Sequence, residues 1–134
     1  MCIRHFTDVF ATDERGAAAP EFAVVATAFL MFIMAIAYLG MMLFTYTAVH
    51  WAVEDGSRVA AVNTSATQSQ VSTAINNDLT SVGLPSATSV TYSVSYSPFQ
   101  VATVTATLTQ SYTVPLLSNF SVTYSATTTV PQAF

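Results

Sequence analysis

The chain has 134 residues, of which 52% are hydrophobic and only 7% are charged. An ordinary soluble domain has roughly a quarter of its residues charged, so this composition favours a membrane protein or an assembly subunit and excludes general disorder. The net charge of -4 includes only three basic residues, which excludes the positive surface that nucleic-acid binding requires.

The N-terminal part divides into a polar leader and a long apolar segment. Residues 1–16 are rich in charge and end in Arg15 and Gly16, and from Ala17 the chain is apolar apart from Glu21. The 23 residues from Phe22 to Phe44 carry no charge. As a helix with a rise of about 1.5 Å per residue, this segment is long enough to cross a hydrocarbon core of about 30 Å. It is longer than the apolar part of a cleavable secretory signal, so we expect it to remain in the mature protein.

Beyond Phe44 the pattern becomes amphipathic, and the sequence predicts that the helix leaves the membrane and continues to residue 62. Tyr46 and Trp51 stand where an interfacial aromatic belt is expected. Residues 17–62 are therefore predicted to form one transmembrane and emergent helix. The large apolar residues of the emergent part are Tyr46, Val49, Trp51, Val53, Val59 and Val62.

Two charged residues and a glycine lie on this emergent helix. Glu54 and Arg58 are spaced i,i+4 with the acid first, which is the favourable order on a helix surface. Gly56 is expected to soften the helix between them. We assign Glu54 and Arg58, together with Phe22 and Gly40 in the apolar segment, to the helix surface or to helix packing.

A second, shorter helix is predicted over residues 66–82, where Val71, Ile75 and Leu79 recur at helical spacing. Gly83 and Pro85 follow, and a glycine followed by a proline is typical of a helix C-terminus. This helix opens the third part of the chain, residues 63–134.

The remaining sequence alternates apolar and hydroxylated residues with a period of two, which is typical of half-buried strands. The three runs cover residues 90–97, 102–114 and 120–127. They predict a small antiparallel sheet whose apolar face is covered by the amphipathic helices. The fold class is therefore α+β: a long N-terminal transmembrane helix, a short second helix and a three-stranded sheet in an extracytoplasmic domain.

The residues that usually carry catalysis or bind metals are scarce. Cys2 is the only cysteine, and the two histidines, His5 and His50, lie on opposite sides of the apolar segment. Residues 63–134 contain no His, Cys, Lys or Arg and a single acid, Asp78. We therefore expect no catalytic residues, no metal site and no cofactor, and we do not expect an enzyme.

The most specific local feature is a glycine at the end of the leader followed by Glu21 in an apolar stretch. A carboxylate at the edge of a bilayer is costly, so an isolated one usually has a function. The arrangement resembles the class III signal of type IV-like pilins, in which a prepilin peptidase cuts after the glycine. That resemblance implies a cut between Gly16 and Ala17 and a pairing of Glu21 with an α-amino group during assembly. The alternative is that Glu21 lies in the headgroup layer at a helix start.

More of the chain resembles the TadE-like pseudopilins of the tight-adherence (Tad) pilus system. The resemblance runs through Arg15–Ala26, the glycine at position 40 and Val53–Ala61, and the strand-rich segment Val101–Leu117 is similar to the ending of many members. Two positions depart from the family: Tyr38 stands where many relatives have an acid, and Thr27 stands where a proline is frequent.

The resemblance implies a non-catalytic minor pilin or pseudopilin that assembles or primes an adhesive pilus. Its partners would be the lipid bilayer, the prepilin peptidase, other pilin and pseudopilin subunits and the assembly machinery. Arg4 and Arg15 before the span and Arg58 after it favour a single pass through the inner membrane with the C-terminus outside. The alternative is an unprocessed, signal-anchored envelope protein whose β-domain binds an extracytoplasmic partner.

Overall fold

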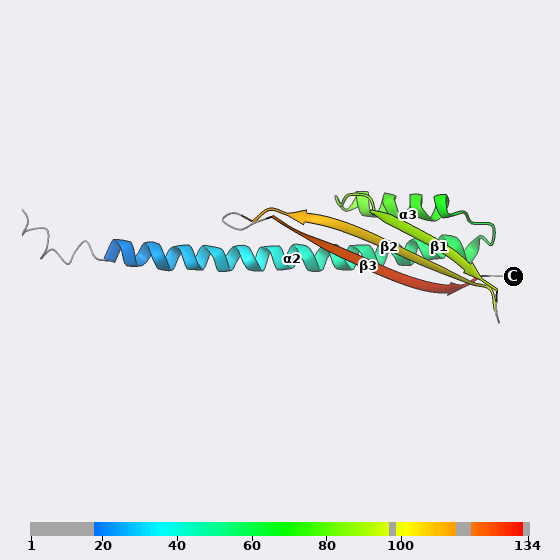
Figure 1. Cartoon of the computed structure of the whole chain (residues 1–134), viewed down its shortest axis with the longest axis horizontal. Helices are drawn as coiled ribbons and strands as arrows, with labels where there is room; N and C mark the ends of the chain where they lie inside the picture. The colour runs from blue at the N-terminus through cyan, green and yellow to red at the C-terminus, as the bar shows by residue number, and fades with distance from the viewer. Residues whose placement is uncertain (1–17, 97–98, 115–118, 133–134) are drawn as a thin grey trace, which may run out of the picture. The chain divides into compact units, whose positions relative to one another are not determined.

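A computed structural model describes residues 18–96, 99–114 and 119–132, so the predicted cleavage site at Gly16 and Ala17 lies outside the described residues. Two helices are followed by three strands (Figure 1), which confirms the predicted α+β fold. The elements are α2 (Ala18–Val62), α3 (Gln68–Ser81), β1 (Ser89–Ser95), β2 (Val101–Tyr112) and β3 (Phe120–Pro131). The chain separates into two compact units, with the boundary between Met41 and Met42 inside α2. The N-terminal unit contains the first half of α2, and the C-terminal unit contains everything after it.

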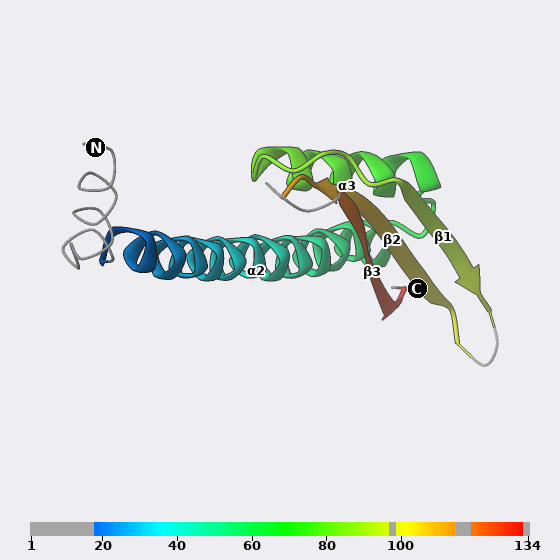
Figure 2. The same cartoon turned by 60° about the vertical axis from the view of Figure 1, so that its left-hand side comes forward.

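The sheet of the C-terminal unit is antiparallel with the strand order β1-β2-β3 (Figures 1 and 2). The central residue Val104 lies opposite Tyr92 on one side and Thr128 on the other. Three predicted strand ends are wrong. β2 ends at Tyr112 instead of residue 114. β1 ends at Ser95, and Tyr96, which we expected on the apolar face, is 74% exposed. β3 continues past the predicted end at residue 127 to Pro131, because it stays paired with β2 over the whole length of that strand.

The hydrophobic core lies between the inner face of the sheet and the two helices of the C-terminal unit. Its sheet side comes from the alternate positions of β2, as the period-two pattern predicts. Its helix side comes from α3 and from the second half of α2. The buried core residues of β2 are Ala102, Val104, Ala106 and Leu108, and those of α3 are Val71, Ile75 and Leu79.

The second half of α2 buries mainly small side chains. Of the large apolar residues predicted for the emergent segment, Val49 and Val53 are buried, whereas Tyr46, Trp51 and Val62 are exposed. The buried positions follow a spacing of three and four residues, as on one face of a helix. They are Thr45, Ala48, Val49, Ala52, Val53, Gly56, Ser57 and Ala60.

Gly56 lies where α3 packs against α2. A Cβ atom at this position would lie 2.5 Å from Cγ1 of Ile75 and 2.9 Å from its Cδ1. Both distances are far below van der Waals contact, so a side chain at residue 56 would require the side chain of Ile75 or α3 itself to move. α2 remains helical through this position. The expectation that Gly56 softens the helix is therefore replaced by a packing role.

α3 has a specific signal at each end. Thr67 is the N-cap, and its side chain and that of Gln70 form a reciprocal capping box. At the other end, Gly83 has φ of 79°, and the N–H groups of Gly83 and Leu84 donate to the carbonyls of Thr80 and Leu79 at 3.0 and 2.9 Å. This is the Schellman arrangement that a C-terminal glycine permits. The predicted end of the helix is confirmed.

A buried glutamine joins the C-terminal end of the sheet to the end of α2. Gln132 is 3% exposed, and its Nε2 donates to the carbonyl of Ala60 at 2.9 Å and to the hydroxyl of Tyr92 at 3.0 Å. Its Oε1 accepts a hydrogen bond of 2.7 Å from Gln100. The carbonyl of Ala60 is in the last turn of α2, where carbonyls have no partner within the helix. Gln132 therefore satisfies a helix end and fixes the sheet against α2.

Candidate membrane anchor and assembly surface

The first half of α2 presents large apolar side chains to the surroundings. In the described part of the chain, one helix, Pro20–Val62, is long and apolar enough to cross a membrane, with a mean hydropathy of 2.5 in its most apolar window. None of the residues in that window is buried within the protein. The most exposed large side chains include Phe22, Val24, Val25, Phe29, Leu30 and Phe32. Such a surface is stable in lipid or against other apolar helices, not in water.

Glu21 lies in the first turn of α2 and is exposed. The helix N-terminus carries a partial positive charge, so a carboxylate is favoured there. Phe22 beside it is also exposed, so the acid lies at the very start of the apolar surface. This placement agrees with both interpretations of Glu21, the pairing with an amine and the headgroup-layer residue. The α-amino group that cleavage would create lies outside the described residues.

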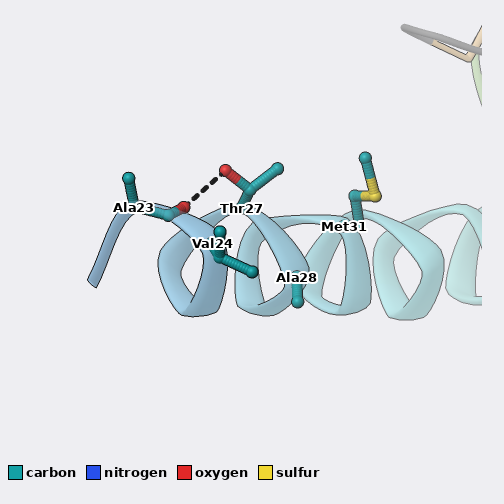
Figure 3. Close-up of a pocket in the computed structure, with 5 residues that line it drawn as sticks. All are labelled: Ala23, Val24, Thr27, Ala28 and Met31. Atoms are coloured by element: carbon teal, nitrogen blue, oxygen red, sulfur yellow. Dashed lines mark hydrogen bonds between the residues drawn. The ribbon is translucent and has the colours of Figure 1, made fainter. Parts of the chain in front are cut away.

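A shallow, almost entirely apolar surface one turn further along α2 is lined by Ala23, Val24, Thr27, Ala28 and Met31 (Figure 3). The hydroxyl of Thr27 donates to the carbonyl of Ala23 at 2.7 Å, as the dashed line in Figure 3 marks. This bond within the helix removes most of the polarity of Thr27. The surface comes from one helix and is open, so its shape suits a second helix or lipid better than an enclosed small molecule.

Gly40 differs from Gly56 although both lie in α2. A Cβ atom at residue 40 would meet nothing within 4 Å. The packing of the chain on itself therefore does not require a glycine here. A close approach of another helix is the role for which a glycine in an apolar helix is suited.

The predicted surface residues Glu54 and Arg58 are both exposed on the second half of α2. In the described part of the chain no ion pair joins them. An exposed pair of this kind contributes little to stability in any case. Nearby, the rings of Tyr46 and His50 pack with their centroids 4.4 Å apart. This contact gives His50 a packing role beside Tyr46 on α2.

A pair of acids, which the sequence did not reveal, forms where the two helices meet. Burial raises the pKa of Asp78 above its ordinary value of 3.8, and the charge of Asp55 and a side-chain hydrogen bond with it add to the increase. One oxygen of Asp78, Oδ2, is buried without a hydrogen-bond partner among the described groups. Asp55 and Asp78 are far apart in sequence, so only the packing of α3 on α2 could bring them together. The described residues include no group of three or more His, Cys, Asp or Glu that could hold a metal.

The outer face of the sheet is a ladder of hydroxyl groups. Threonines opposite one another on β2 and β3 form side-chain hydrogen bonds, of which Thr105–Thr127 is the shortest at 2.9 Å. The pairs Thr103–Thr129 and Thr109–Thr123 are joined at 3.4 and 3.2 Å. The period-two pattern predicted a hydroxylated face, and the structure adds the cross-strand pairing. This face is uncharged, so electrostatic recognition of a partner is not its chemistry.

These features define a membrane-anchored α+β protein with an exposed apolar helix and a small hydroxyl-faced sheet. Residues 16–58 match the family model described as TadE-like protein, which confirms the resemblance predicted from the sequence. The match begins at the predicted cleavage glycine and ends at Arg58, so it covers most of α2 and none of the sheet. It points to an involvement in the Tad pilus. No curated protein matches the chain. No solved structure matches it either.

Proposed function

We propose that the protein is a non-catalytic minor pilin or pseudopilin that assembles or primes an adhesive Tad pilus. The observation that carries this proposal is the first half of α2, which lies within the matched segment and combines a fully exposed apolar surface with Glu21 in its first turn. An ordinary membrane anchor needs the apolar surface but has no need of the acid. A subunit that packs its helix among other helices can use both.

In this proposal the helix has two successive environments. The bilayer covers the apolar surface first, and the helices of neighbouring pilin subunits replace the lipid during assembly. Prepilin peptidase cuts after Gly16, and the new α-amino group on Ala17, or that of a neighbour, pairs with Glu21. The pair neutralises an acid that would otherwise enter an apolar bundle as an uncompensated charge. Glu21 therefore makes assembly dependent on processing.

The experiment compares Glu21→Ala with Gly16→Leu in cells that make the pilus. Glu21→Ala should be inserted and cleaved but should impair filaments and surface attachment. Gly16→Leu should accumulate at full length, because a bulky residue before the cut does not fit the peptidase, and intact mass measures this directly. Glu54→Ala, an exposed acid on the same helix beyond the span, is the matched control and should behave as wild type.

Two outcomes would contradict the proposal in different ways. Normal filaments and adhesion in Glu21→Ala cells would remove the charge-pairing role and leave Glu21 as a headgroup-layer residue. A Gly16→Leu protein with the same mass as wild type would remove the processing step. The signal-anchored envelope protein would then be the better account.

The proposal also requires the β-domain outside the inner membrane. Arg4 and Arg15 precede the span and Arg58 alone follows it, so the positive side should remain cytoplasmic. A reporter enzyme that works only outside the cytoplasm should be active when it is fused after Phe134. One that works only in the cytoplasm should be inactive at the same position. Activity of the cytoplasmic reporter would indicate the opposite orientation.

A further inference from the structure

The turn between α2 and α3 carries a short motif that the proposed function does not use. Asn63, Thr64 and Ser65 follow directly after α2 and match Asn-X-Ser/Thr, in which X is any residue except proline. This motif marks an asparagine that can carry a sugar chain in a protein that leaves the cytoplasm. A motif of three residues also arises by chance. The structure around the asparagine therefore decides whether it can be used.

The motif combines the residue types that one reaction needs. The nitrogen of a side-chain amide is a poor nucleophile, because its lone pair is shared with the carbonyl group. A hydrogen bond donated to the amide oxygen stabilises negative charge there and makes the N–H group more acidic. The hydroxyl group two residues further along the chain gives the transferring enzyme a second polar group to bind beside the amide. An asparagine is therefore best suited to accept a sugar when its oxygen is hydrogen-bonded and its nitrogen is free.

The side chain of Asn63 has this arrangement. Its Oδ1 accepts a hydrogen bond of 3.0 Å from the N–H of Ser65, which closes an Asx-turn. The backbone carbonyl of Asn63 accepts a second bond, of 2.9 Å, from the N–H of Ala66. In the described part of the chain, Nδ2 of Asn63 has no hydrogen-bond partner. The amide oxygen is thus polarised by a backbone donor, and the amide nitrogen stays available.

The turn is exposed and is fixed at both ends. All three residues of the motif are exposed. At the start of the turn, the N–H of Asn63 donates to the carbonyl of Val59 in α2 at 3.2 Å. At its end, Ala66 is buried and Thr67 is the N-cap of α3. The two helices that this turn connects (Figure 1) hold its ends, so a large enzyme can reach the amide without unfolding the domain.

A second match to the motif, Asn119, Phe120 and Ser121, lies in a different environment. Asn119 is exposed, but β3 begins at the next residue. Phe120 pairs with Tyr112 of β2, and their rings lie 5.5 Å apart. Ser121 continues the strand opposite Ser111. Because the backbone is extended here, the N–H of Ser121 cannot close an Asx-turn onto Asn119, and no other described residue donates to that side chain.

The composition of the C-terminal unit gives a sugar chain a physical role. After Met42 the chain has only four charged residues, and in residues 63–134 the only one is Asp78. Charged side chains normally keep the surface of a small domain soluble. Val62, next to the turn, is also 84% exposed. A hydrated sugar chain on Asn63 would cover this apolar residue and supply some of the solubility that charged residues supply elsewhere.

We propose that Asn63 is a site of N-glycosylation and that Asn119 is not. The donor is a sugar carried on a polyprenyl diphosphate. Nδ2 of Asn63 attacks the anomeric carbon of this sugar, and a C–N bond forms as the C–O bond to the diphosphate breaks. The amide proton passes to a base of the transferring enzyme, and polyprenyl diphosphate leaves. One condition rests on the proposed function: the turn has to lie outside the cytoplasm.

The test measures the intact mass of the full chain, extracted in detergent from the cells that make it. The wild-type protein should be heavier than its polypeptide by whole sugar residues, whether or not residues 1–16 have been removed. Fragmentation of its peptides should locate the sugar on Asn63. Asn63→Gln should lose all of the added mass, because glutamine does not fit the motif. Asn119→Gln is the matched control and should keep all of it.

Two substitutions of the third residue separate the chemistry of the motif from the shape of the turn. Ser65→Ala keeps the backbone N–H that bonds to Asn63 but removes the hydroxyl, so the added mass should be lost. Ser65→Thr keeps both groups and should retain the sugar on at least about half of the molecules. Ser65 is exposed, so neither change should alter the fold, which circular dichroism checks.

Three results would overturn this assignment of Asn63. A wild-type protein with the mass of its bare polypeptide would exclude glycosylation. An equal amount of sugar on Asn119 would show that the motif alone, and not the turn, selects the site. Added mass that persists in Asn63→Gln would assign the sugar to another residue. The reporter fusions at Phe134 measure the orientation separately, so a bare polypeptide outside the cytoplasm would leave the pilin function standing, whereas a domain inside the cytoplasm would contradict both.

Discussion

The two halves of α2 are both apolar, but they use their side chains in opposite ways. Before Met42 the helix exposes large residues such as Phe29 and Leu30, and the protein itself buries none of the most apolar window. After Met42 one face of the helix is buried, and that face consists largely of small residues such as Ala52 and Gly56. Hydrophobicity alone therefore does not distinguish a surface meant for the surroundings from one meant for the core. The size of the side chains does, because a small face admits close packing of a helix and a sheet.

The largest expected effect comes from placing the same charge in each half. Val53 is fully buried, and Val53→Asp should lower the free energy of unfolding of the C-terminal unit by more than about 3 kcal/mol, because an unpaired carboxylate would enter the core. Val25 is 66% exposed, and Val25→Asp should leave the fold of that unit intact in detergent. Chemical denaturation followed by circular dichroism compares the two. Equal destabilisation would show that the halves do not differ as described.

A glycine substitution in each half gives the next largest contrast. Gly56→Ala adds a methyl group 2.5 Å from Cγ1 of Ile75 and should destabilise the C-terminal unit by about 1 to 3 kcal/mol through overpacking. Gly40→Ala meets no neighbour within 4 Å and should leave this unit's stability unchanged. The same denaturation measurement applies. If Gly56→Ala were as stable as wild type, α3 would not depend on the glycine for its position.

Removing a hydrogen bond at the end of α2 should change the stability by a similar or smaller amount. Gln132→Leu keeps the approximate volume but leaves the carbonyl of Ala60 buried and without its donor, which should cost about 1 to 3 kcal/mol. Gln68→Leu removes an exposed bond to Val90 and should cost less than about 1 kcal/mol. Thermal unfolding of both variants shows which of them has lost more stability. The reverse order would show that the buried amide contributes little to holding the sheet on α2.

The smallest effect concerns pH and occurs only in the C-terminal unit. The pKa of Asp78 is higher in the folded protein than the ordinary 3.8, so folded Asp78 keeps its proton at pH values where the unfolded chain has lost it. Stability should therefore be greatest below about pH 3.8, fall as the pH rises through the raised pKa, and then level off. Asp78→Asn should remove this slope and be the more stable protein at neutral pH. A slope that persists in the variant would assign the pH dependence to another group.

Patterns with a clear period predicted much of the fold. The uncharged run from Phe22 to Phe44 and the alternation in β2 each point to one structure, because the period of a pattern fixes which side chains share a face. The capping residues of α3 predicted its end at Gly83 for a similarly local reason. In the second half of α2 the pattern did not single out the alanines that the structure buries, whereas Tyr46 and Trp51, which were expected in an interfacial belt, are exposed. The space between this part of α2 and the sheet holds mainly small residues such as Ala48, Ala52 and Ala60, together with Val49 and Val53.

Some of the candidate functional residues could be predicted from the sequence, and others could not. Glu21 and Phe22 follow from a local motif, and the structure places both at the start of the exposed apolar helix. The pairing of Asp55 with Asp78 could not be foreseen, because it joins two helices whose relative position no local pattern determines. The role of Gln132 was equally hidden, since its partner Ala60 lies 72 residues away.

By itself the sequence determined the apolar span, the order of helices and strands and the hydroxylated face of the sheet, because each of these depends on residues that are close in the chain. Only the tertiary structure decided which face of α2 is buried, why residue 56 is a glycine, and that α3 lies beside β1. These features arise where segments distant in sequence pack together, and the free energy of that packing depends on shape and distance rather than on residue type alone.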